Sequence, residues 1–200
     1  MAKRDTYPVR IEGVTRQLPL FAVSPQLSIA VFNLLGDTEI VTAAARGLAK
    51  KLAKVDADVL VTAETKSVPL IYHLAIEMNK PWVVLRKDYK PYMGEALSAE
   101  TLSITTGKPQ TLYLDEKDQA LLRNKRVILV DDVISTGSTL QGMRLLMDKV
   151  GAKVVAAAAV FTEGERAQWQ DIYALGHLPL FTGDGKPRVE TRKKGSRAKG

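Results

Sequence analysis

The sequence predicts an α/β fold: a mainly parallel central sheet with helices on both faces, preceded by a small N-terminal cap region. Between residues 38 and 161, short apolar runs alternate with stretches of helical spacing, which is the order of a parallel sheet. Residues 127–130 are branched and apolar without interruption, as expected of a strand buried on both faces. Residues 7–35 form short apolar stretches broken by glycine and proline, which favours a separate cap with at least one hairpin.

The first expected helix begins at Asp37 or Thr38, keeps one apolar face as far as Leu52, and carries lysines in its last turns, where they suit the helix dipole. The second, over 68–79, has Pro69 in its first turn, where proline is tolerated. Shorter helices are expected at 115–122, from 140 onward and near 165–171. The expected strands of the sheet and its surroundings are 59–62, 82–86, 101–105, 110–114, 127–130, 154–161 and 178–181, with 87–101 as a loop.

Composition narrows the class of protein. The chain has 200 residues, 46% hydrophobic and 26% charged, as is typical of one soluble globular domain with a sizeable core. No apolar run approaches the ~20 residues of a membrane span and no signal-peptide core follows the N-terminus, so we expect a cytoplasmic protein without membrane contact. Cysteine is absent, which rules out disulfides and thiolate metal sites and fits a reducing compartment.

The charge pattern separates a tail from the rest. We expect a single domain over 1–185, made of a cap (1–36), a ligand-binding core (37–162) and a C-terminal extension (163–185). Seven basic residues and one acidic residue in 186–200 account for most of the net charge of +7. This segment is predicted to be a disordered, solubilising tail. A weak, salt-sensitive contact with nucleic acid is the alternative, although the tail has no aromatic residue for base stacking.

Residues 127–139 are the most informative stretch. An apolar strand is followed by the adjacent carboxylates Asp131 and Asp132, and a polar turn then leads into a helix. The turn contains Ser135, Thr136, Gly137, Ser138 and Thr139. A helix N-terminus attracts a phosphate through free N–H groups, and the hydroxyls add donors. The carboxylates can accept hydrogen bonds from sugar hydroxyls or from magnesium-bound water. The stretch therefore predicts a site for a ribose 5-phosphate.

A capped helix after a buried strand is the simpler alternative. However, two neighbouring carboxylates at the mouth of an apolar strand repel each other and cost stability unless something binds there. Neither G-x-x-x-x-G-K-[ST] nor G-x-G-x-x-G occurs in the chain, which excludes the nearest rival phosphate motifs. The carboxyl end of a strand is also where open α/β sheets bind ligands, which favours the sugar phosphate.

Residues 127–139 resemble the signature of the type I phosphoribosyltransferases: an apolar run, Asp-Asp, two apolar residues, then Ser-Thr-Gly-Ser-Thr. The resemblance implies that fold over about 38–161 and binding of phosphoribosyl diphosphate (PRPP). The carboxylates Asp131 and Asp132 would hold the ribose hydroxyls, and the turn would hold the 5-phosphate. It also implies transfer of the 5-phosphoribosyl group to a nucleobase, with release of pyrophosphate. Mg²⁺ would arrive with PRPP and contact the two carboxylates through water at most. A homodimer is the usual assembly.

The same resemblance assigns a second turn to the PRPP site. Glu64, Thr65 and Lys66 follow the strand 59–62, at the position where the family binds pyrophosphate, largely through backbone N–H groups. A plain strand–turn–helix is the alternative. Parallel strands end at one edge of a sheet, so both turns are expected to lie together.

A third group of residues follows the next strand. Arg86 and Lys87, with Lys90 shortly after, match an Arg-Lys pair that the family has before a mobile loop, and 88–103 would then form a lid. The alternative is a solvated basic strand end. Together with Asp131 and Asp132, the Arg86–Lys87 pair is the expected catalytic set, because catalysis here is positioning plus stabilisation of the departing pyrophosphate.

The expected identity of the nucleobase depends on positions at which this sequence departs from the patterns of the family. Members acting on 6-oxopurines usually have a carboxylate at the position of Ser135, which leaves adenine-like, orotate-like or regulatory relatives. Residues 86–91 are similar to the Arg-Lys-x-x-Lys-Leu-Pro run of adenine phosphoribosyltransferases. Their loop Glu-Tyr-Gly is replaced by residues 105–107, Thr-Thr-Gly, with Glu95 or Glu100 as candidate substitutes. We therefore predict an adenine-type enzyme of purine salvage. A PRPP sensor of the purine-repressor type, acting through a protein or RNA partner, is the alternative.

Overall fold

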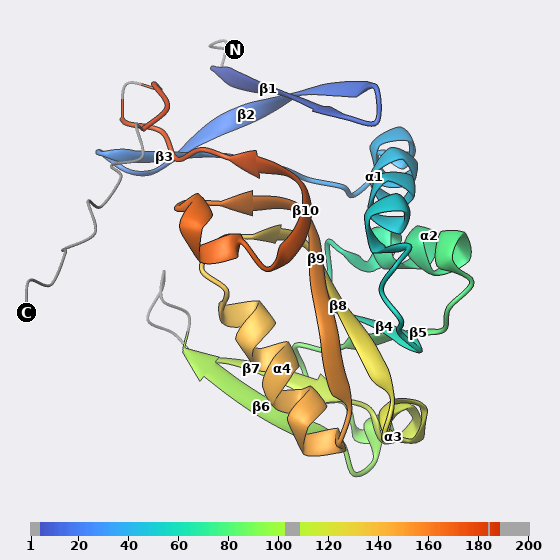
Figure 1. Ribbon diagram of the computed structural model, residues 1–200. Coiled ribbons are helices and arrows are strands. Elements are labelled where there is room, and N and C mark those ends of the chain that lie inside the picture. Colours follow the sequence, from blue (N-terminus) through green and yellow to red (C-terminus); the bar gives the residue numbers. More distant parts are fainter. Residues whose placement is uncertain (1–4, 103–108, 184, 189–200) are drawn as a thin grey trace, which may run out of the picture.

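A parallel sheet with the strand order β10-β9-β8-β4-β5 forms the centre of the molecule (Figure 1). The computed structural model describes residues 5–102, 109–183 and 185–188. The strands of this sheet are β4 (Val59–Ala63), β5 (Trp82–Leu85), β8 (Arg126–Ile134), β9 (Lys153–Glu163) and β10 (Ile172–Leu178). Each is parallel to its neighbour. The predicted parallel sheet is confirmed.

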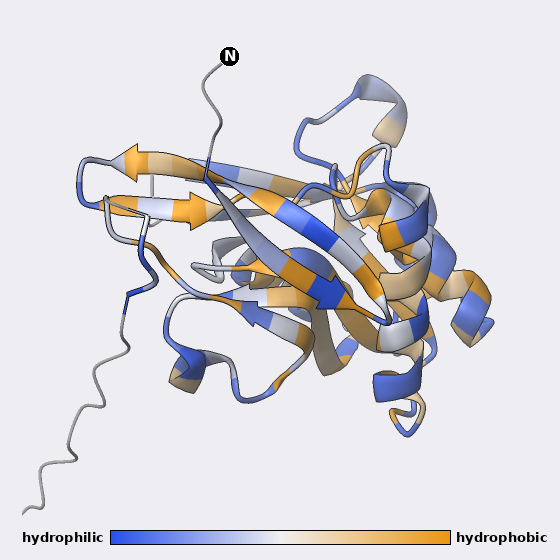
Figure 2. Cartoon of the chain, turned by 90° about the horizontal axis from the view of Figure 1, so that it is seen from above, coloured by the Kyte–Doolittle hydropathy of each residue, from blue (hydrophilic) through white to orange (hydrophobic). Residues whose placement is uncertain are grey.

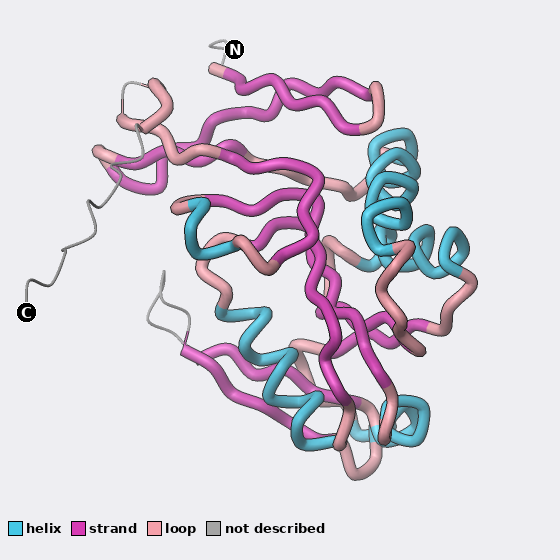
Figure 3. The backbone as a smooth tube through the Cα atoms, in the orientation of Figure 1, coloured by secondary structure: helices cyan, strands magenta, loops and turns pink. Residues whose placement is uncertain are grey.

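Different elements cover the two faces of the sheet (Figures 1 and 3). On one face, α1 (Thr38–Leu52) and α2 (Val68–Met78) share an apolar cluster with Ile128 and Val130 of β8. On the other, α4 (Ser138–Val150) packs on the antiparallel hairpin of β6 (Leu97–Leu102) and β7 (Pro109–Leu114). Short elements connect these parts: α3 (Glu116–Leu122) and the 3₁₀ turns η1 (Pro91–Met93) and η2 (Arg166–Trp169). No helix in the described residues is long and apolar enough to cross a membrane.

The predicted cap is an antiparallel sheet of β1 (Thr6–Ile11), β2 (Val14–Ser24) and β3 (Leu27–Ala30). Hydrophobic and hydrophilic residues alternate along it (Figure 2), because one face lies on the core and the other faces solvent. A charged contact joins it to the first helix: Arg16 Nε lies 2.6 Å from Asp37 Oδ2, and Asp37 also accepts a hydrogen bond from Ile40 N as the N-cap of α1.

Aromatic side chains hold the cap against the end of the sheet. Ser28 and Phe181 exchange two backbone hydrogen bonds of 2.9 Å, and the Phe181 ring meets the Tyr7 ring edge-on at 5.2 Å. The Phe32 and Phe161 rings meet in the same way at 4.9 Å. These contacts place the cap over the carboxyl ends of β9 and β10 (Figure 1).

The last strand of the sheet was predicted in the wrong place. Residues 178–181 were expected to form it, but β10 covers Ile172–Leu178 and pairs with β9, whereas Phe181 makes only isolated bridges, to Ser28 and Pro187. Because β10 is an edge strand, it tolerates tyrosine, glycine and histidine and lacks a continuous apolar run. Beyond it, Arg188 N donates to Leu180 O. The chain therefore folds back as far as residue 188, and 189–200 of the predicted tail lie outside the described residues.

Two further boundaries differ. The strand β6 begins at Leu97, which pairs with Leu114, so 97–102 of the predicted loop and lid belong to a covered hairpin. Ala99 and Thr101 are both buried and stand two residues apart, which is the spacing of a strand with one covered face and not of the predicted loop. The signature strand β8 continues to Ile134, since Asp131 pairs with Ala159 of β9. The doublet thus lies within the strand rather than after it.

The Phe181 anchor leads to a prediction about the cap. Phe181→Ala should lower the free energy of unfolding by about 3–5 kcal/mol, because a 2% exposed ring is replaced by a cavity. It should also speed proteolysis within residues 6–30. Phe21, 56% exposed on β2, is the matched control, and Phe21→Ala should change stability by less than about 0.5 kcal/mol. Denaturant unfolding measures both, and equal effects of the two variants would contradict the anchoring role.

Candidate active site

The carboxyl ends of β4 and β8 bring the two predicted binding turns together. The strands pair with Thr62 level with Val130, and Thr62 Oγ1, fully buried, donates to Val130 O at 2.6 Å. The turn 64–67 therefore leaves the sheet beside the acidic doublet. The expectation that both turns share one edge is met by this register.

A side-chain hydrogen bond ties the two turns to each other. Ser67 Oγ donates to Asp131 Oδ1 at 3.1 Å, and Asp132 N donates to the same oxygen at 2.9 Å. Burial raises the pKa of Asp131 above its usual range, and the neighbouring carboxylate of Asp132 adds to the shift. The two hydrogen bonds oppose this shift. A ligand that donates hydrogen bonds here, as sugar hydroxyls do, would stabilise the charged doublet further.

The signature turn is shaped to receive an anion. The helix α4 begins at Ser138 after Gly137, whose φ of 77° favours glycine. Gly137 has no side chain to cap this helix, and Ser138 N makes only a long hydrogen bond of 3.5 Å to Thr136 Oγ1, so a ligand can compete for the N–H groups of the first turn. Thr136 Oγ1 lies 3.0 Å from Ser138 Oγ, which orients both hydroxyls. A pocket of about 30 Å³ follows the turn from Asp131 to Leu140.

Trp169 of η2 supports this turn from outside, and the sequence gave no sign of it. A Cβ at Gly137 would lie 3.0 Å from the Trp169 ring, so both the φ angle and this contact require glycine. Trp169 Nε1 also donates to Glu163 O at 2.8 Å, which connects the turn to the end of β9.

The turn 64–67 exposes the predicted residues Thr65 and Lys66, and the Glu64–Thr65 peptide is cis. The helix α2 starts at Val68, and Ser67, in the N-cap position, makes no side-chain capping bond to it. Its hydroxyl bonds to Asp131 instead. Val68 N donates to Thr65 O at 3.2 Å and Pro69 has no N–H, so the first three residues of α2 offer a ligand at most the N–H of Leu70.

The Glu64 side chain holds two of the other predicted site residues. Its carboxylate accepts hydrogen bonds from Arg86 Nε at 2.5 Å and from Lys87 N at 2.8 Å. The hydrogen bond to Glu64 raises the pKa of Arg86, so the guanidinium stays charged. Glu64 therefore positions the Arg86–Lys87 pair beside the turn instead of facing an anionic ligand with its own charge.

The remaining predicted residues are the lysines Lys87 and Lys90, the candidate Glu95 and residues 105–107. Lys87 and Lys90 are exposed at the start of the connection to η1, where no contact of the described residues brings them to the doublet. Glu95 N is held by Glu116 Oε2 next to α3, which precedes the amino end of β8, so Glu95 lies at the wrong end of the sheet for the base. Residues 105–107 lie outside the described residues.

Glu163 was missed by the sequence analysis. It is the last residue of β9 and 8% exposed, and burial raises its pKa to about 7. The signal was available: like the doublet, it directly follows a long run of small and apolar residues at the carboxyl end of a strand.

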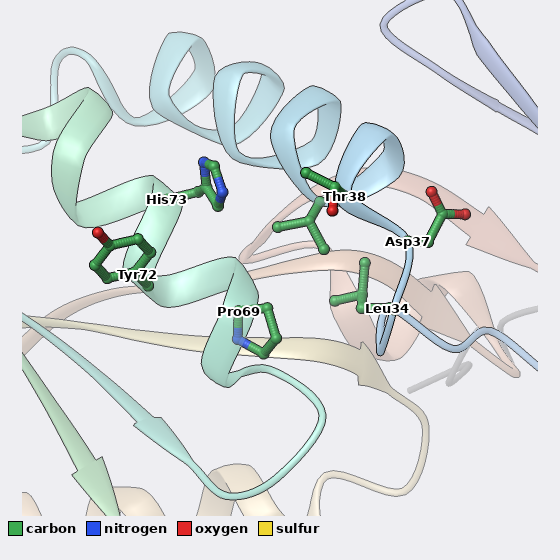
Figure 4. A pocket seen from close by; sticks show the side chains of 8 residues that line it. Leu34, Asp37, Thr38, Pro69, Tyr72 and His73 are labelled. Carbon is green, nitrogen blue, oxygen red and sulfur yellow. The ribbon is translucent and has the colours of Figure 1, made fainter.

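A separate cavity of about 160 Å³ lies between the first turns of α1 and α2 (Figure 4). Tyr72 and His73 line it from α2, and Thr38 and Leu34 from the start of α1 and the segment before it. It contains none of the predicted ligand-binding residues. The site at the carboxyl edge is therefore defined by its turns and not by the larger cavities.

Comparison with known proteins agrees with this geometry. The sequence profile of the phosphoribosyl transferase domain matches residues 34–178, which include all five strands of the parallel sheet. The chain belongs to the phosphoribosyl transferase domain family. The resemblance seen in residues 127–139 is confirmed. The fold agrees as well: the crystal structure of adenine phosphoribosyltransferase from Thermoanaerobacter pseudethanolicus covers 86% of this chain and 95% of its own, with a TM-score of 0.62 at 21% identity.

Relatives of this phosphoribosyl transferase domain include a regulator and two kinds of enzyme. The chain is 31% identical over 133 residues to the purine biosynthesis transcriptional repressor PurR of Bacillus subtilis, covering 66% of this chain and 46% of the repressor. It is 33% identical to the hypoxanthine/guanine phosphoribosyltransferase of Ferroglobus placidus, over 66% of both chains. Identity to the adenine phosphoribosyltransferase of Fervidobacterium nodosum is 28%, over 75% of this chain and 85% of that one. The chain thus spans about half the length of the repressor and two thirds of the hypoxanthine/guanine enzyme.

The buried carboxylate of Glu163 makes stability depend on pH. Its pKa is about 7 in the folded protein and about 4.5 when unfolded, so the folded state holds a proton that the unfolded state releases, and stability falls as pH rises through this window. Glu163→Gln removes the effect. Relative to wild type, the variant should gain about 1–3 kcal/mol of unfolding free energy on going from pH 4.5 to pH 8. Denaturant unfolding at both pH values measures it; a difference between the two proteins that does not vary with pH would contradict the burial of a charge at Glu163.

Proposed function

We propose that this protein catalyses the Mg²⁺-dependent transfer of a 5-phosphoribosyl group from PRPP to a purine base in purine salvage, releasing pyrophosphate, with adenine as the preferred base. The observation that carries the proposal is the pair of turns 64–67 and 135–139, joined by the hydrogen bond between Ser67 and Asp131. PRPP has a phosphate and a pyrophosphate on one ribose. The start of α4 suits the 5-phosphate, the carboxylates of Asp131 and Asp132 suit the ribose hydroxyls, and the turn 64–67 with the adjacent Arg86–Lys87 pair suits the pyrophosphate.

The proposed role of each site residue follows from its position at this edge of the sheet. The 5-phosphate binds at the start of α4, with Ser135, Thr136, Gly137, Ser138 and Thr139 around it. Asp131 and Asp132 accept hydrogen bonds from the ribose hydroxyls. The pyrophosphate binds at residues 64–66, and Arg86 and Lys87, held by Glu64, stabilise the charge that develops on it as it leaves. Lys66 and Lys90 are exposed cations that can add to this stabilisation.

The donor set suits Mg²⁺ that is bound together with the substrate. Within the described residues, no three His, Cys, Asp or Glu side chains gather so that they could hold a metal ion by themselves. The carboxylate oxygens of Asp131 and Asp132 are hard donors at the edge where the phosphates would lie. Mg²⁺ prefers one or two such carboxylates plus phosphate oxygens and water. When bound, the ion neutralises charge on the pyrophosphate.

The preference for adenine rests on Ser135, which cannot act as an acid or base at neutral pH, whereas enzymes for 6-oxopurines usually have a carboxylate there. The relative from Fervidobacterium nodosum, which aligns over 85% of its length, supports the same choice. The relative from Ferroglobus placidus, a hypoxanthine/guanine enzyme, makes hypoxanthine and guanine the necessary comparison substrates. We propose the cytoplasm as the location.

The test is pyrophosphate release from PRPP and Mg²⁺ with adenine, hypoxanthine, guanine, xanthine and orotate. We expect the highest kcat/KM with adenine. Asp132→Asn should raise the Kd for PRPP about tenfold or more and leave the fold intact, because a charged hydrogen bond worth about 1.5–3 kcal/mol is lost. Calorimetric titration measures the Kd. Asp148→Asn, an exposed carboxylate on α4, is the control and should leave it unchanged. Unchanged affinity in the Asp131→Asn/Asp132→Asn double variant would reject the role of the doublet.

A regulatory function is the second candidate, because the Bacillus subtilis relative at 31% identity is a transcriptional repressor. A PRPP sensor would need the same two turns but no turnover. The base panel separates the two candidates: PRPP binding without turnover on any base favours the sensor, and robust turnover rejects it.

We also propose a homodimer formed through the outer face of α2. Tyr72 and Ile76 are 52% and 61% exposed, and the Tyr72 ring lies 6.1 Å from that of Trp82 on the edge strand β5. Contiguous exposed apolar side chains of this kind mark interaction surfaces. Ile76→Asp should shift the protein to a monomer in light scattering, whereas Leu121→Asp on α3, 37% exposed, should not. A wild type that is monomeric at micromolar concentration would contradict the proposal.

A further inference from the structure

The carboxylate of Glu163 lies beside the proposed PRPP site and takes no part in the contacts described above. Parallel pairing of β8 and β9 places Ile134 level with Thr162, so Ser135 and Glu163 directly follow the last paired residues of two neighbouring strands. Although Glu163 is buried, no group in the described part of the chain donates a hydrogen bond to its carboxylate. Glu163 thus supplies a carboxylate close to Ser135, the position at which enzymes for 6-oxopurines usually have one.

The side chain of Glu163 belongs to the face of the sheet that the cap covers. Successive residues of a strand point to opposite faces. Phe161 points to the cap, since its ring meets that of Phe32, and Glu163 has the same parity. Its partner in the register, Leu178 of β10, also belongs to the apolar cluster under the cap.

The order of the strands indicates that the purine base binds near the end of β9. The pyrophosphate turn follows β4, on one side of β8, whereas β9 lies on the other side. A ribose held over the doublet with its pyrophosphate toward β4 can be attacked at C1 only from the opposite side. That side is bounded by the end of β9 and by the cap.

On the basis of the proposed function, we infer that the Glu163 carboxylate is the general base that removes the N7 proton of the purine during phosphoribosyl transfer. The N9 lone pair forms the bond to C1 of the ribose. The bond from C1 to the pyrophosphate oxygen breaks, and its electron pair leaves with pyrophosphate. The imidazole ring of the purine must then lose a proton to stay neutral, and the N7 proton passes to Glu163.

Two features support this role. Burial raises the pKa of Glu163 to about 7, which is the basicity that a general base needs near neutral pH. The hydrogen bond from Trp169 Nε1 to Glu163 O, together with the packing of Trp169 against Gly137, fixes the end of β9 relative to the phosphate turn. A buried carboxylate without a partner costs stability, so a purely structural role offers no compensating gain.

Two substitutions separate catalysis from binding. Gln can still accept a hydrogen bond from N7–H but cannot take its proton. Glu163→Gln should therefore lower kcat at least about 100-fold and leave KM for the base within about threefold. Glu163→Ala should lose the hydrogen bond as well. Glu165→Gln, which changes an exposed carboxylate after β9, is the matched control and should keep wild-type kinetics.

Binding of two inert analogues, measured with PRPP and Mg²⁺ present, gives a readout that does not need turnover. 9-Deazaadenine carries N7–H, whereas 7-deazaadenine has carbon at that position. Wild type and Glu163→Gln should bind 9-deazaadenine at least about tenfold more tightly than 7-deazaadenine, and Glu163→Ala should lose the preference. Melting temperatures no lower than that of wild type, together with unchanged PRPP affinity, exclude a folding defect in either variant.

The outcomes distinguish this inference from the proposed function. Wild-type kcat in Glu163→Gln, or a preference for 9-deazaadenine that survives in Glu163→Ala or is missing in wild type, would overturn the role of Glu163. A wild type that binds the analogues as expected but turns over no base would overturn the enzyme function while keeping Glu163 as the purine contact.

Discussion

The parallel pairing of β4 with β8 is the constraint on which the candidate site depends. Because parallel strands end at the same edge of a sheet, the chain leaves both strands side by side, and each exit leads directly into a helix N-terminus. The buried hydrogen bond from Thr62 to Val130 O and the bond from Ser67 to Asp131 hold this edge in register. A shift of one residue would turn Asp131 to the other face and separate the two turns.

Charges at this edge differ in how well they are compensated. Glu64 is neutralised by Arg86, and Asp131 accepts two hydrogen bonds that counter its burial. Glu163 lies in an apolar setting and carries a raised pKa without such compensation among the described residues. Groups of this kind lower stability, and they are concentrated where ligands bind and chemistry occurs. The carboxylates of Asp131 and Glu163, whose burial raises their pKa, therefore lie at the same edge of the sheet as the N-termini of α2 and α4.

The cap completes the edge on the side away from the pyrophosphate turn. It is attached through Phe181, through Phe32 and through the ion pair of Arg16 with Asp37. The segment after β10 is consequently part of the cap's support. This arrangement encloses the end of β9 between the cap and the signature turn, and it gives a buried environment to a side chain that ends a strand.

The sequence by itself predicted the parallel sheet, the cap and the meeting of the turns 64–67 and 135–139 at one edge of the sheet. Each depends on local patterns, namely apolar runs, helical spacing and turn residues, that are read over a few neighbouring positions. It missed the early start of β6 and the place of β10, because an edge strand and a hairpin lack the continuous apolar run of a buried strand. Only the tertiary structure decided that Glu64 holds Arg86, that Ser67 holds Asp131, that Trp169 supports Gly137 and that Glu163 follows β9 where Ser135 follows the neighbouring β8. These contacts join residues from different strands and turns, and they are set by register and burial, which no local pattern records.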